Sequence, residues 1–289
     1  MKNFAQYVNS FAELIENGSQ IPLAQSQPSS RPSPAADAPC AMIFSPHPDD
    51  EVIIGALPYR LAQQCGWRVI NVAVTQGSNA ERRCERWSEL QGCCDSIGFE
   101  LLATAPGGLT DINPDSRDQE PAKWSGNTAC IAGILTQYRP SLILYPHAND
   151  WNSTHIGTHL LIRDALQSMA AADFSCLVCE TEFWGQMQNP NLMVEVTPGQ
   201  LAALISALSF HVGEIQRNPY HLTLPAWMID NTRRGTELVG GQGGESPGFQ
   251  FAVLYRLLRW ANGGFTPLNG SGRMLAATDD PAEMLNISG

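Results

Sequence analysis

Residues 41–75 of this 289-residue chain read AMIFSPHPDDEVIIGALPYRLAQQCGWRVINVAVT. The first five residues are a short apolar run, residues 51–64 have the spacing of a helix, and residues 68–75 are rich in β-branched side chains. A strand, a helix and a second strand at this spacing are typical of parallel strands joined by a helical crossover. Pro58 lies inside the helical stretch and predicts a kink there.

The same alternation continues along the chain. It predicts helices over residues 79–97, 121–138 and 154–172 and strands over residues 99–103, 141–145 and 177–182. Asn79 and Thr154 are the expected caps of the first and third of these helices. A polar loop separates the strand 99–103 from the helix 121–138. Because a parallel sheet is covered by helices on both faces, the sequence predicts an α/β fold, a Rossmann-like three-layer sandwich with a mostly parallel sheet.

Three segments are expected. Residues 1–21 form an amphipathic helix that packs on the domain surface or serves as an interaction arm; residues 22–39 form a Pro/Ser-rich linker; and residues 40–289 form one domain. The helix carries apolar residues at helical spacing and ends near Gly18: Phe4, Tyr7, Phe11, Leu14 and Ile15. The section from about 198 to 289 is expected to build the substrate pocket, with the glycine-rich stretch 240–248 as an irregular loop covering it.

Composition excludes some classes of partner. The net charge of −11 argues against a phosphate-backbone partner and against anionic membranes, so we expect no nucleic acid. No apolar run approaches the roughly 20 residues of a membrane span. The N-terminus lacks the features of a signal peptide, and the eight cysteines show no disulfide framework, which predicts free thiols and a cytoplasmic location. Cys176 and Cys179 lie in a predicted strand, three apart, and should therefore point to opposite faces.

One histidine and three carboxylates follow the first predicted strand, in His47-Pro-Asp-Asp-Glu51. Turn chemistry accounts for a proline and one aspartate. It does not account for three consecutive carboxylates, which repel one another unless a cation neutralises them. A divalent metal is such a cation, and His47 and Asp50 can converge on it across the turn. A solvated acidic turn is the alternative.

A second polar group, residues 147–159, follows the predicted strand 141–145. Ligands gather at the carboxyl edge of a parallel sheet, so this group is expected to open onto the first one. A catalytic zinc takes about three His, Asp or Glu ligands and leaves one position for water. His47, Asp50 and one histidine of the second group meet that requirement. His155 and His159 are both candidates, and either could instead cap or pack a helix.

His47-Pro-Asp-Asp-Glu51 resembles the signature of the PIG-L/LmbE-like family of metal-dependent deacetylases. Four further features agree with that family in order and spacing: Thr75-Gln-Gly77, Arg86-x-x-Glu89 with Gly98, Arg139-Pro140, and the segment that ends at His155. The resemblance covers roughly residues 41–182. It implies an LmbE-like fold and a zinc-dependent deacetylase that acts on N-acetylated amino sugars.

The resemblance also implies residue roles. Zinc would have three ligands: His47, Asp50 and His155. Iron, cobalt or manganese could occupy the same ligands. Asp49 would be the general base that takes a proton from the attacking water. Arg86 would contact substrate hydroxyls or the acyl oxygen, unless it pairs with Glu89 on its own helix.

One departure from the family pattern matters for catalysis. Where many members have a histidine that stabilises the oxyanion and donates a proton, and an aspartate that orients it, this chain has Asn152 and Thr154. Our hypothesis is that Asn152 assists the oxyanion and His147 supplies the acid. Glu182 and Trp184 end a predicted strand at the same edge and suit a sugar site. A core tryptophan beside a solvated glutamate is the alternative.

The sequence thus predicts a hydrolase that removes an N-acyl group, most simply N-acetyl, from an amino sugar or its conjugate. The substrate is a small molecule, and the acidic net charge fits one that is neutral or becomes cationic on deacetylation. Two alternatives stay open: a hydrolase of a non-sugar amide or thiol conjugate with the same metal chemistry, and a non-catalytic metal- or sugar-binding protein. A homo-oligomer is also left open.

Overall fold

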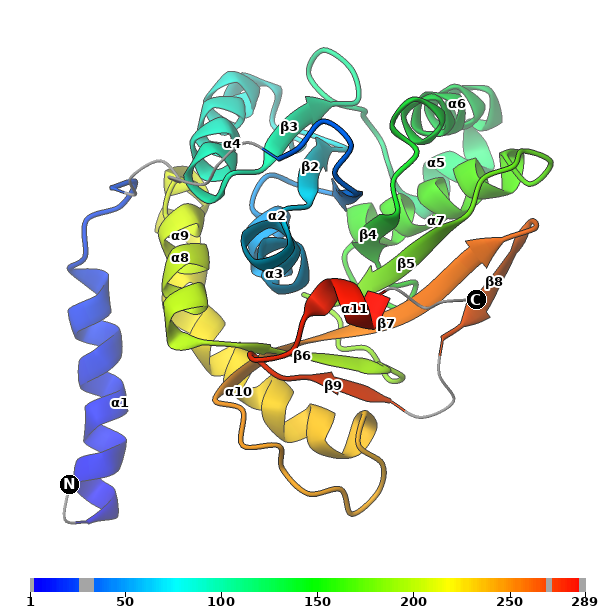
Figure 1. Cartoon of the computed structure of the whole chain (residues 1–289). Coiled ribbons are helices and arrows are strands. Elements are labelled where there is room, and N and C mark those ends of the chain that lie inside the picture. The colour runs from blue at the N-terminus through cyan, green and yellow to red at the C-terminus, as the bar shows by residue number, and fades with distance from the viewer. Residues whose placement is uncertain (1–2, 26–33, 269–271, 286–289) are drawn as a thin grey trace.

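A mixed β-sheet forms the middle layer of the protein, seen in a computed structural model that describes residues 3–25, 34–268 and 272–285 (Figure 1). Its strands are β1 (Cys40–Ser45), β2 (Arg68–Ala73), β3 (Glu100–Ala103), β4 (Leu142–Pro146), β5 (Cys176–Thr181), β6 (Leu192–Val196), β7 (Phe251–Ala261), β8 (Gly264–Pro267) and β9 (Arg273–Leu275). Their order is β3-β2-β1-β4-β5-β7-β6-β9, with β8 paired to β7. The first five strands in this order are parallel, and β7 runs antiparallel to both its neighbours. The predicted α/β fold with a mostly parallel sheet is confirmed.

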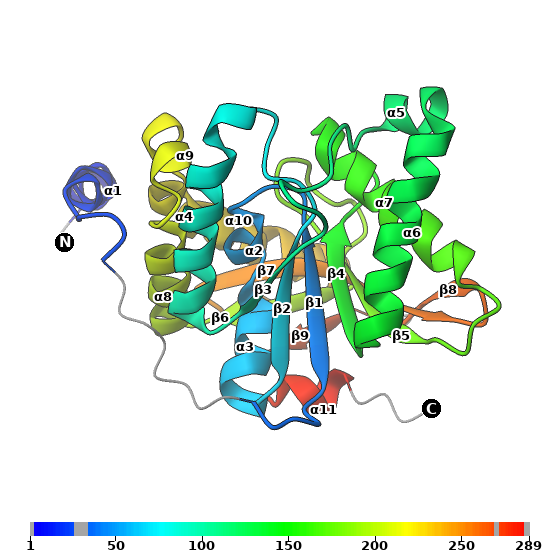
Figure 2. The ribbon, with the colours of Figure 1, turned by 90° about the horizontal axis from the view of Figure 1, so that it is seen from above.

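Helices cover both faces of the sheet. They are α1 (Phe4–Ser19), α2 (Asp50–Ile53), α3 (Ala56–Cys65), the 3-10 turn η1 (Ala80–Arg82), α4 (Arg83–Ile97), α5 (Pro114–Gln119), α6 (Pro121–Tyr138), α7 (Ser153–Ser168), α8 (Pro198–Leu208), α9 (Val212–Arg217), α10 (Tyr220–Leu238) and α11 (Pro281–Leu285). Figure 2 shows α2, α3, α4 and α8 on one side of the central strands and α5, α6 and α7 on the other.

Strand alternation divides the interior into two main cores. In β1, Ala41 and Ile43 pack in the core beneath α3, α4 and α8, whereas Met42 and Phe44 pack in the core beneath α6 and α7. Cys179 and Cys176 follow the same rule and lie in the first and second core respectively, as predicted. All eight cysteines are free.

The helix predicted over residues 51–64 is two helices, α2 and α3. They separate at Gly55, where a Cβ would lie 2.4 Å from the backbone oxygen of Glu51. Pro58 is the third residue of α3, a position whose N–H has no intrahelical partner in any case. The predicted kink at Pro58 is therefore wrong, and the close backbone approach at Gly55 sets the break.

Two predicted caps also differ. Asn79 caps only the short turn η1, through the backbone N–H of Glu81. The cap of α7 is Asn152 and not Thr154, because the Oδ1 of Asn152 accepts the N–H groups of Thr154 and His155. This helix ends at Ser168, and the predicted polar loop before residue 121 contains α5.

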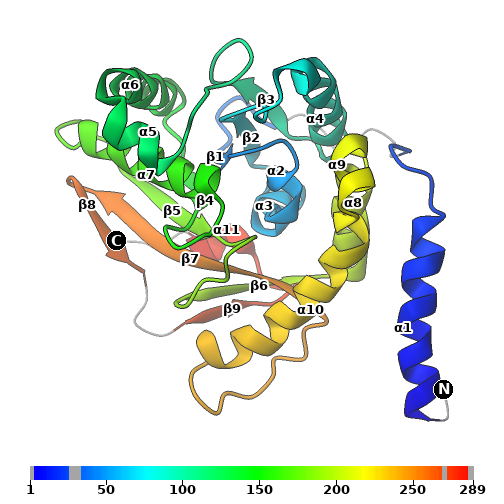
Figure 3. The same ribbon diagram turned by 180° about the vertical axis from the view of Figure 1, so that it is seen from behind.

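The N-terminal helix α1 forms, but its apolar stripe does not pack on the domain. Figures 1 and 3 show it beside the three layers, and it contacts α10 near Gly18 and Leu222. Its apolar side chains are exposed, with Phe4 87% exposed. The expected packing is thus wrong along most of the helix. Residues 1–2 and 26–33, in the predicted helix and linker, lie outside the described residues.

The last third of the chain mainly completes the sheet. β6, β7 and β9 extend it, and α10 packs on β7. The glycine-rich stretch 240–248 lies beside the end of α10 and near Met274 of β9, and no residue of it lines the site cavity described below, so its predicted covering role is wrong. None of the helices in the described ranges has the length and apolar character that a membrane span requires.

Candidate metal centre and its cavity

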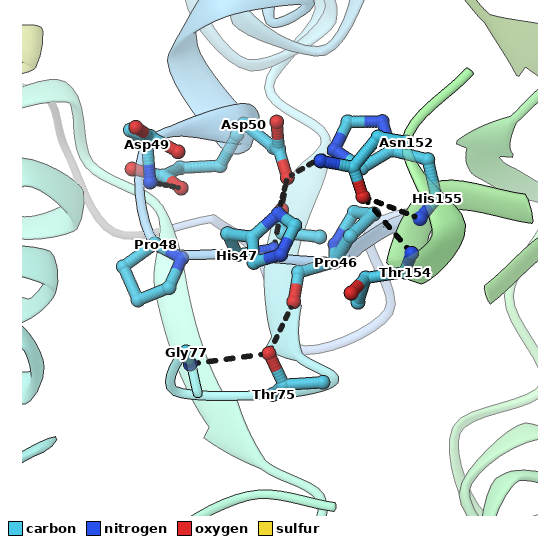
Figure 4. Close-up of polar contacts among 12 residues, drawn as sticks. Pro46, His47, Pro48, Asp49, Asp50, Thr75, Gly77, Asn152, Thr154 and His155 are labelled. Carbon is cyan, nitrogen blue, oxygen red and sulfur yellow. Dashed lines mark hydrogen bonds and ion pairs between the residues drawn. The ribbon is translucent and has the colours of Figure 1, made fainter. Parts of the chain in front are cut away.

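The loops that follow β1, β2 and β4 meet at one edge of the sheet and surround a cavity of about 530 Å³. Thr75 links two of these loops: its hydroxyl donates to the carbonyl of Pro46 at 2.7 Å and accepts the N–H of Gly77 at 3.2 Å (Figure 4). The clusters that follow the first and fourth strands therefore face one space, as the parallel order of these strands requires.

Three predicted metal ligands lie together, and two of them, His47 and Asp50, line this cavity. Ligand atoms of His47, Asp50 and His155 all lie within 4.8 Å of one another. One carboxylate oxygen of Asp50 lies 3.5 Å from Nδ1 of His47 and 3.4 Å from Nε2 of His155 (Figure 4). The same oxygen accepts the backbone N–H of His47 at 2.8 Å, which fixes the loop.

The donor set fits a divalent metal. Among the residues that the structure describes, the buried Nε2 of His155 has no hydrogen-bond partner. Burial alone would lower the pKa of His155, but Asp50 and Asp150 raise it to about 10. Burial alone would raise the pKa of Asp50, but His155 and His47 hold it well below its usual range. The group therefore binds positive charge, and two histidines, one carboxylate and an open cavity suit zinc.

Asp150 contacts the ring nitrogen of His155 that does not face Asp50. Its Oδ2 lies 3.4 Å from Nδ1 of His155, and its Oδ1 accepts the backbone N–H of Asn152 at 2.9 Å. A carboxylate on the second nitrogen of a ligating histidine fixes the ring and raises its basicity. The sequence analysis missed this residue, although an aspartate in the same loop as His155 was a usable signal.

Asp49 lines the cavity in a left-handed conformation, with φ of 117°. Its N–H donates to Glu51 at 3.0 Å, and its residue exposure is only 7%. Burial raises the pKa of Asp49 well above its usual value, and the charge of Asp50 raises it further, whereas Arg86 lowers it. A cation bound beside Asp50 would oppose the rise. The position and the raised pKa suit a group that accepts and returns a proton.

Glu51 lies beneath Asp49 and is fully buried. Besides the N–H of Asp49, it accepts the thiol of Cys93 at 3.1 Å and Nε2–H of His211 at 2.8 Å. The ligand atoms of Glu51, Cys93 and His211 also lie within 4.8 Å, but their mutual hydrogen bonds account for the arrangement. We interpret this trio as the support that holds Asp49 in its turn.

Arg86 also lines the cavity. Its Nη2 donates to the carbonyl of Pro48 at 3.1 Å, and Gly77 leaves room for it, since a Cβ there would lie 2.1 Å from Nη1. The alternative pairing with Glu89 is not observed: Glu89 instead accepts the N–H of Gly213. Arg86 thus reaches the site from α4.

His147 does not line this cavity, so the structure gives no support to its predicted role as the acid. Its Nε2 donates to the carbonyl of Gly185 at 2.8 Å, and its Nδ1 accepts the N–H of Asn149 at 3.3 Å. It borders a separate cavity of about 330 Å³. Asn152 does line the first cavity, but its oxygen caps α7, so only its amide N–H₂ remains for a substrate.

Of the two predicted sugar-binding residues, only Trp184 lines the cavity. Glu182 is buried, pairs with Arg234 at 2.8 Å and does not line the cavity, so its position does not support the predicted contact with a sugar. Trp184 does line the cavity, and its ring packs edge-on against Tyr220, which also lines it, at 5.4 Å between centroids. Sequence reasoning missed the charged lining from α4, η1 and α9: Arg82, Arg83, Glu214 and Arg217.

Comparisons with known proteins agree with the motifs. Residues 42–166 match the sequence model of a family described as PIG-L: GlcNAc-PI de-N-acetylase. No curated protein sequence matches the chain. The structure is similar to N,N'-diacetylchitobiose deacetylase from Pyrococcus horikoshii, at 16% identity and a TM-score of 0.56, over 91% of this chain and 94% of that one.

Two further solved structures share the fold. The zinc-inhibited form of teicoplanin deacetylase Orf2 matches at 16% identity and a TM-score of 0.54, over 77% of this chain and 99% of that one. The 4-carboxy-2-hydroxymuconate hydratase GalB from Pseudomonas putida KT2440 matches at 13% identity and a TM-score of 0.57, over 76% and 95%. At these identities the likeness shows the fold, and the hydratase shows that this fold serves more than one reaction. Residues 42–166, with the motifs that they contain, are thus similar to the PIG-L family.

Proposed function

We propose that this protein is a divalent-metal-dependent hydrolase, with zinc as the metal, that removes an N-acetyl group from an amino sugar or its conjugate. The observation that carries the proposal is the convergence of His47, Asp50 and His155, because His47 and Asp50 line a cavity together with Asp49. The family match supports it, as do two structural relatives whose names describe deacetylases.

The metal would be held by His47, Asp50 and His155, with Asp150 orienting His155. When bound, it would polarise the amide carbonyl as a Lewis acid and lower the pKa of a water molecule. Asn152 would donate its amide N–H to the oxygen of the tetrahedral intermediate, because its own oxygen is engaged by α7.

We assign both proton transfers to Asp49. It would take a proton from the attacking water and return that proton to the leaving nitrogen. His147 is directed away from the cavity, and no histidine other than His47 lines it in the described part of the chain. A carboxyl group whose pKa lies above its usual range suits both steps better than a fully exposed one.

Substrate binding would use the aromatic side of the cavity. Trp184 and Tyr220 present ring faces and edges that suit the apolar face of a sugar ring. Arg86 would donate to a substrate hydroxyl or to the acyl oxygen, from the position next to Pro48.

The test is acetate release from N-acetylglucosamine and several of its conjugates. The comparison uses metal-loaded protein, protein treated with a chelator, and Asp49→Asn, with the exposed Asp173→Asn as matched control. We expect release that requires both the metal and Asp49 and that Asp173→Asn leaves unchanged. Release that survives chelation or Asp49→Asn would contradict the mechanism.

A non-catalytic binding protein is the second candidate. The orientation of His147, together with Asn152 and Thr154 where many relatives have a histidine and an aspartate, favours it. One equivalent of bound metal without acetate release from any sugar would support this candidate or a hydrolase of a non-sugar amide. A wider panel of amides and thiol conjugates would separate these two.

A further inference from the structure

Positive charge is concentrated on one side of the site cavity. Four of the chain's 17 lysines and arginines line it, although the net charge is −11: Arg82, Arg83, Arg86 and Arg217. The first three come from η1 and the start of α4, and the last ends α9. Hydrolysis of a neutral amide gives no reason for more than one of them.

The carboxylates on this side do not pair with every arginine. Glu214 contacts three of them: it accepts from Arg82 at 3.0 Å, pairs closely with Arg217 and lies 3.8 Å from Arg86. The other carboxylate, Asp111, is already paired with Lys123 at 2.5 Å. Arg82 also lies 3.5 Å from Glu85, so three of the four arginines have a close carboxylate, and Arg83 has none among the described residues.

Several guanidinium donors have no acceptor. Buried Nε of Arg83, Nη2 of Arg82 and Nε of Arg86 lack a hydrogen-bond partner among the described residues. Within the described residues, Arg83 takes part in no hydrogen bond or ion pair, and its side chain lines the cavity. Arg217 is only loosely covered, with 68% of its side chain exposed. Unmatched donors in a partly buried wall suit a ligand that brings several acceptor oxygens.

This side of the cavity is continuous with the metal group. Arg86 donates to the carbonyl of Pro48, the residue before Asp49, and Tyr220 lies three residues after Arg217 in the lining of the same space. One molecule of the size of a substituted sugar can therefore touch both sides of a cavity of about 530 Å³.

We propose that the substrate carries an anionic group, a carboxylate or a phosphate, that binds Arg83 and Arg217 while its N-acyl group lies at His47, Asp50 and His155. This inference rests on the proposed hydrolase function. It also replaces the expectation of a neutral or cationic substrate, because the net charge of the chain does not describe the charge of this cavity. The guanidinium fork matches both oxyanions.

Two pairs of probes test the inference. The carboxymethyl glycoside of N-acetylglucosamine is compared with its carboxamide, and N-acetylglucosamine 1-phosphate with the methyl glycoside. We expect kcat/KM at least about tenfold higher for the anionic member of one or both pairs, since a hydrogen bond to a charged group commonly contributes a factor of that size. Which pair shows the preference distinguishes carboxylate from phosphate.

Variants connect the preference to the arginines. Arg83→Gln and Arg217→Gln should each reduce the ratio of kcat/KM between the anionic and neutral probes by about tenfold. Arg82 and Arg86 are left intact because their side chains are less exposed, at 31% and 11%, than that of Arg217 at 68%. Arg233→Gln, an exposed arginine of α10 that does not line the cavity, is the matched control and should keep the ratio.

Binding of the same probes to Asp49→Asn, measured by calorimetry, separates this inference from the proposed function. Tight binding of an anionic probe that weakens in Arg83→Gln, without hydrolysis by the native chain, would support the inference and refute the proposed function. Equal hydrolysis of anionic and neutral probes would overturn the inference and keep the hydrolase. Absence of both binding and hydrolysis would overturn both.

Discussion

The buried carboxylate of Glu51 provides the sharpest test of how the site is built. It accepts three donors at once: the N–H of Asp49, the thiol of Cys93 and Nε2–H of His211. Glu51→Gln keeps the size of the side chain but replaces one acceptor oxygen with a donor N–H₂. Asp49 donates to one oxygen of Glu51, and Cys93 and His211 donate to the other. In either orientation, the N–H₂ group of the new amide therefore faces at least one of these donors.

The magnitude follows from these contacts. Each buried donor left without a partner costs about 1–3 kcal/mol, and at least one donor is lost in either orientation. We therefore expect the free energy of unfolding to fall by at least about 1–3 kcal/mol. The left-handed backbone of Asp49 is a strained conformation of about 1–3 kcal/mol, so the loss of its hydrogen bond should also let Asp49 move. A displacement of about 1 Å can reduce kcat about 100-fold.

Urea unfolding and steady-state kinetics measure both effects. Glu89→Gln on α4 is the matched control, because one of its oxygens accepts the N–H of Gly213 and the other has no partner in the described ranges. An amide can satisfy that position, so we expect a change below about 1 kcal/mol. If Glu51→Gln unfolded at the same urea concentration as Glu89→Gln and kept its kcat, the supporting role of Glu51 would be refuted.

Three further predictions concern histidines and their partners. Asp150→Asn should weaken metal affinity about 10–100-fold, measured by competition with a chelator, because it removes the carboxylate behind His155; unchanged affinity would contradict this. His147→Gln should keep kcat within about threefold of the native value, since His147 borders a different cavity, and a loss of about 100-fold would restore its predicted catalytic role. Burial lowers the pKa of His159 to about 4, against about 6.5 in the unfolded chain. The stability that neutral His159 contributes is complete above pH 6.5 and is lost as the pH falls towards 4, by about 3 kcal/mol in total. His159→Gln should reduce this decline of the free energy of unfolding, measured with urea. An identical decline in both proteins would contradict the prediction.

The sequence predicted the parts of the fold that depend on local pattern. The β-branched run that forms β2 and the apolar run that forms β1 were visible as strands, and the order of strands and helices predicted a parallel sheet. Because parallel strands place their carboxyl ends at one edge, the convergence of the His47 and His155 loops also followed from order alone.

Contacts between distant parts of the chain could not be predicted. His147 donates to a carbonyl 38 residues away, and Glu182 pairs with an arginine 52 residues away; both contacts turn a polar side chain away from the site. The break at Gly55 depends on a single close backbone approach, whereas the sequence pattern pointed to Pro58. Arg82 and Arg83 looked like an ordinary basic pair on a helix surface, since only the position of α9 shows that they line a cavity.

The place of β7 in the sheet has a consequence for the order in which the protein can be made. This strand lies between β5 and β6 and pairs with both. Its residues, 251–261, follow those two strands in the chain by more than fifty residues. During synthesis, the strands that carry the metal group are complete long before β7 leaves the ribosome. Until then β5 presents unpaired N–H and C=O groups, which favour pairing with other chains. The nascent protein should therefore be most prone to aggregation after its chemistry is assembled and before its sheet is finished.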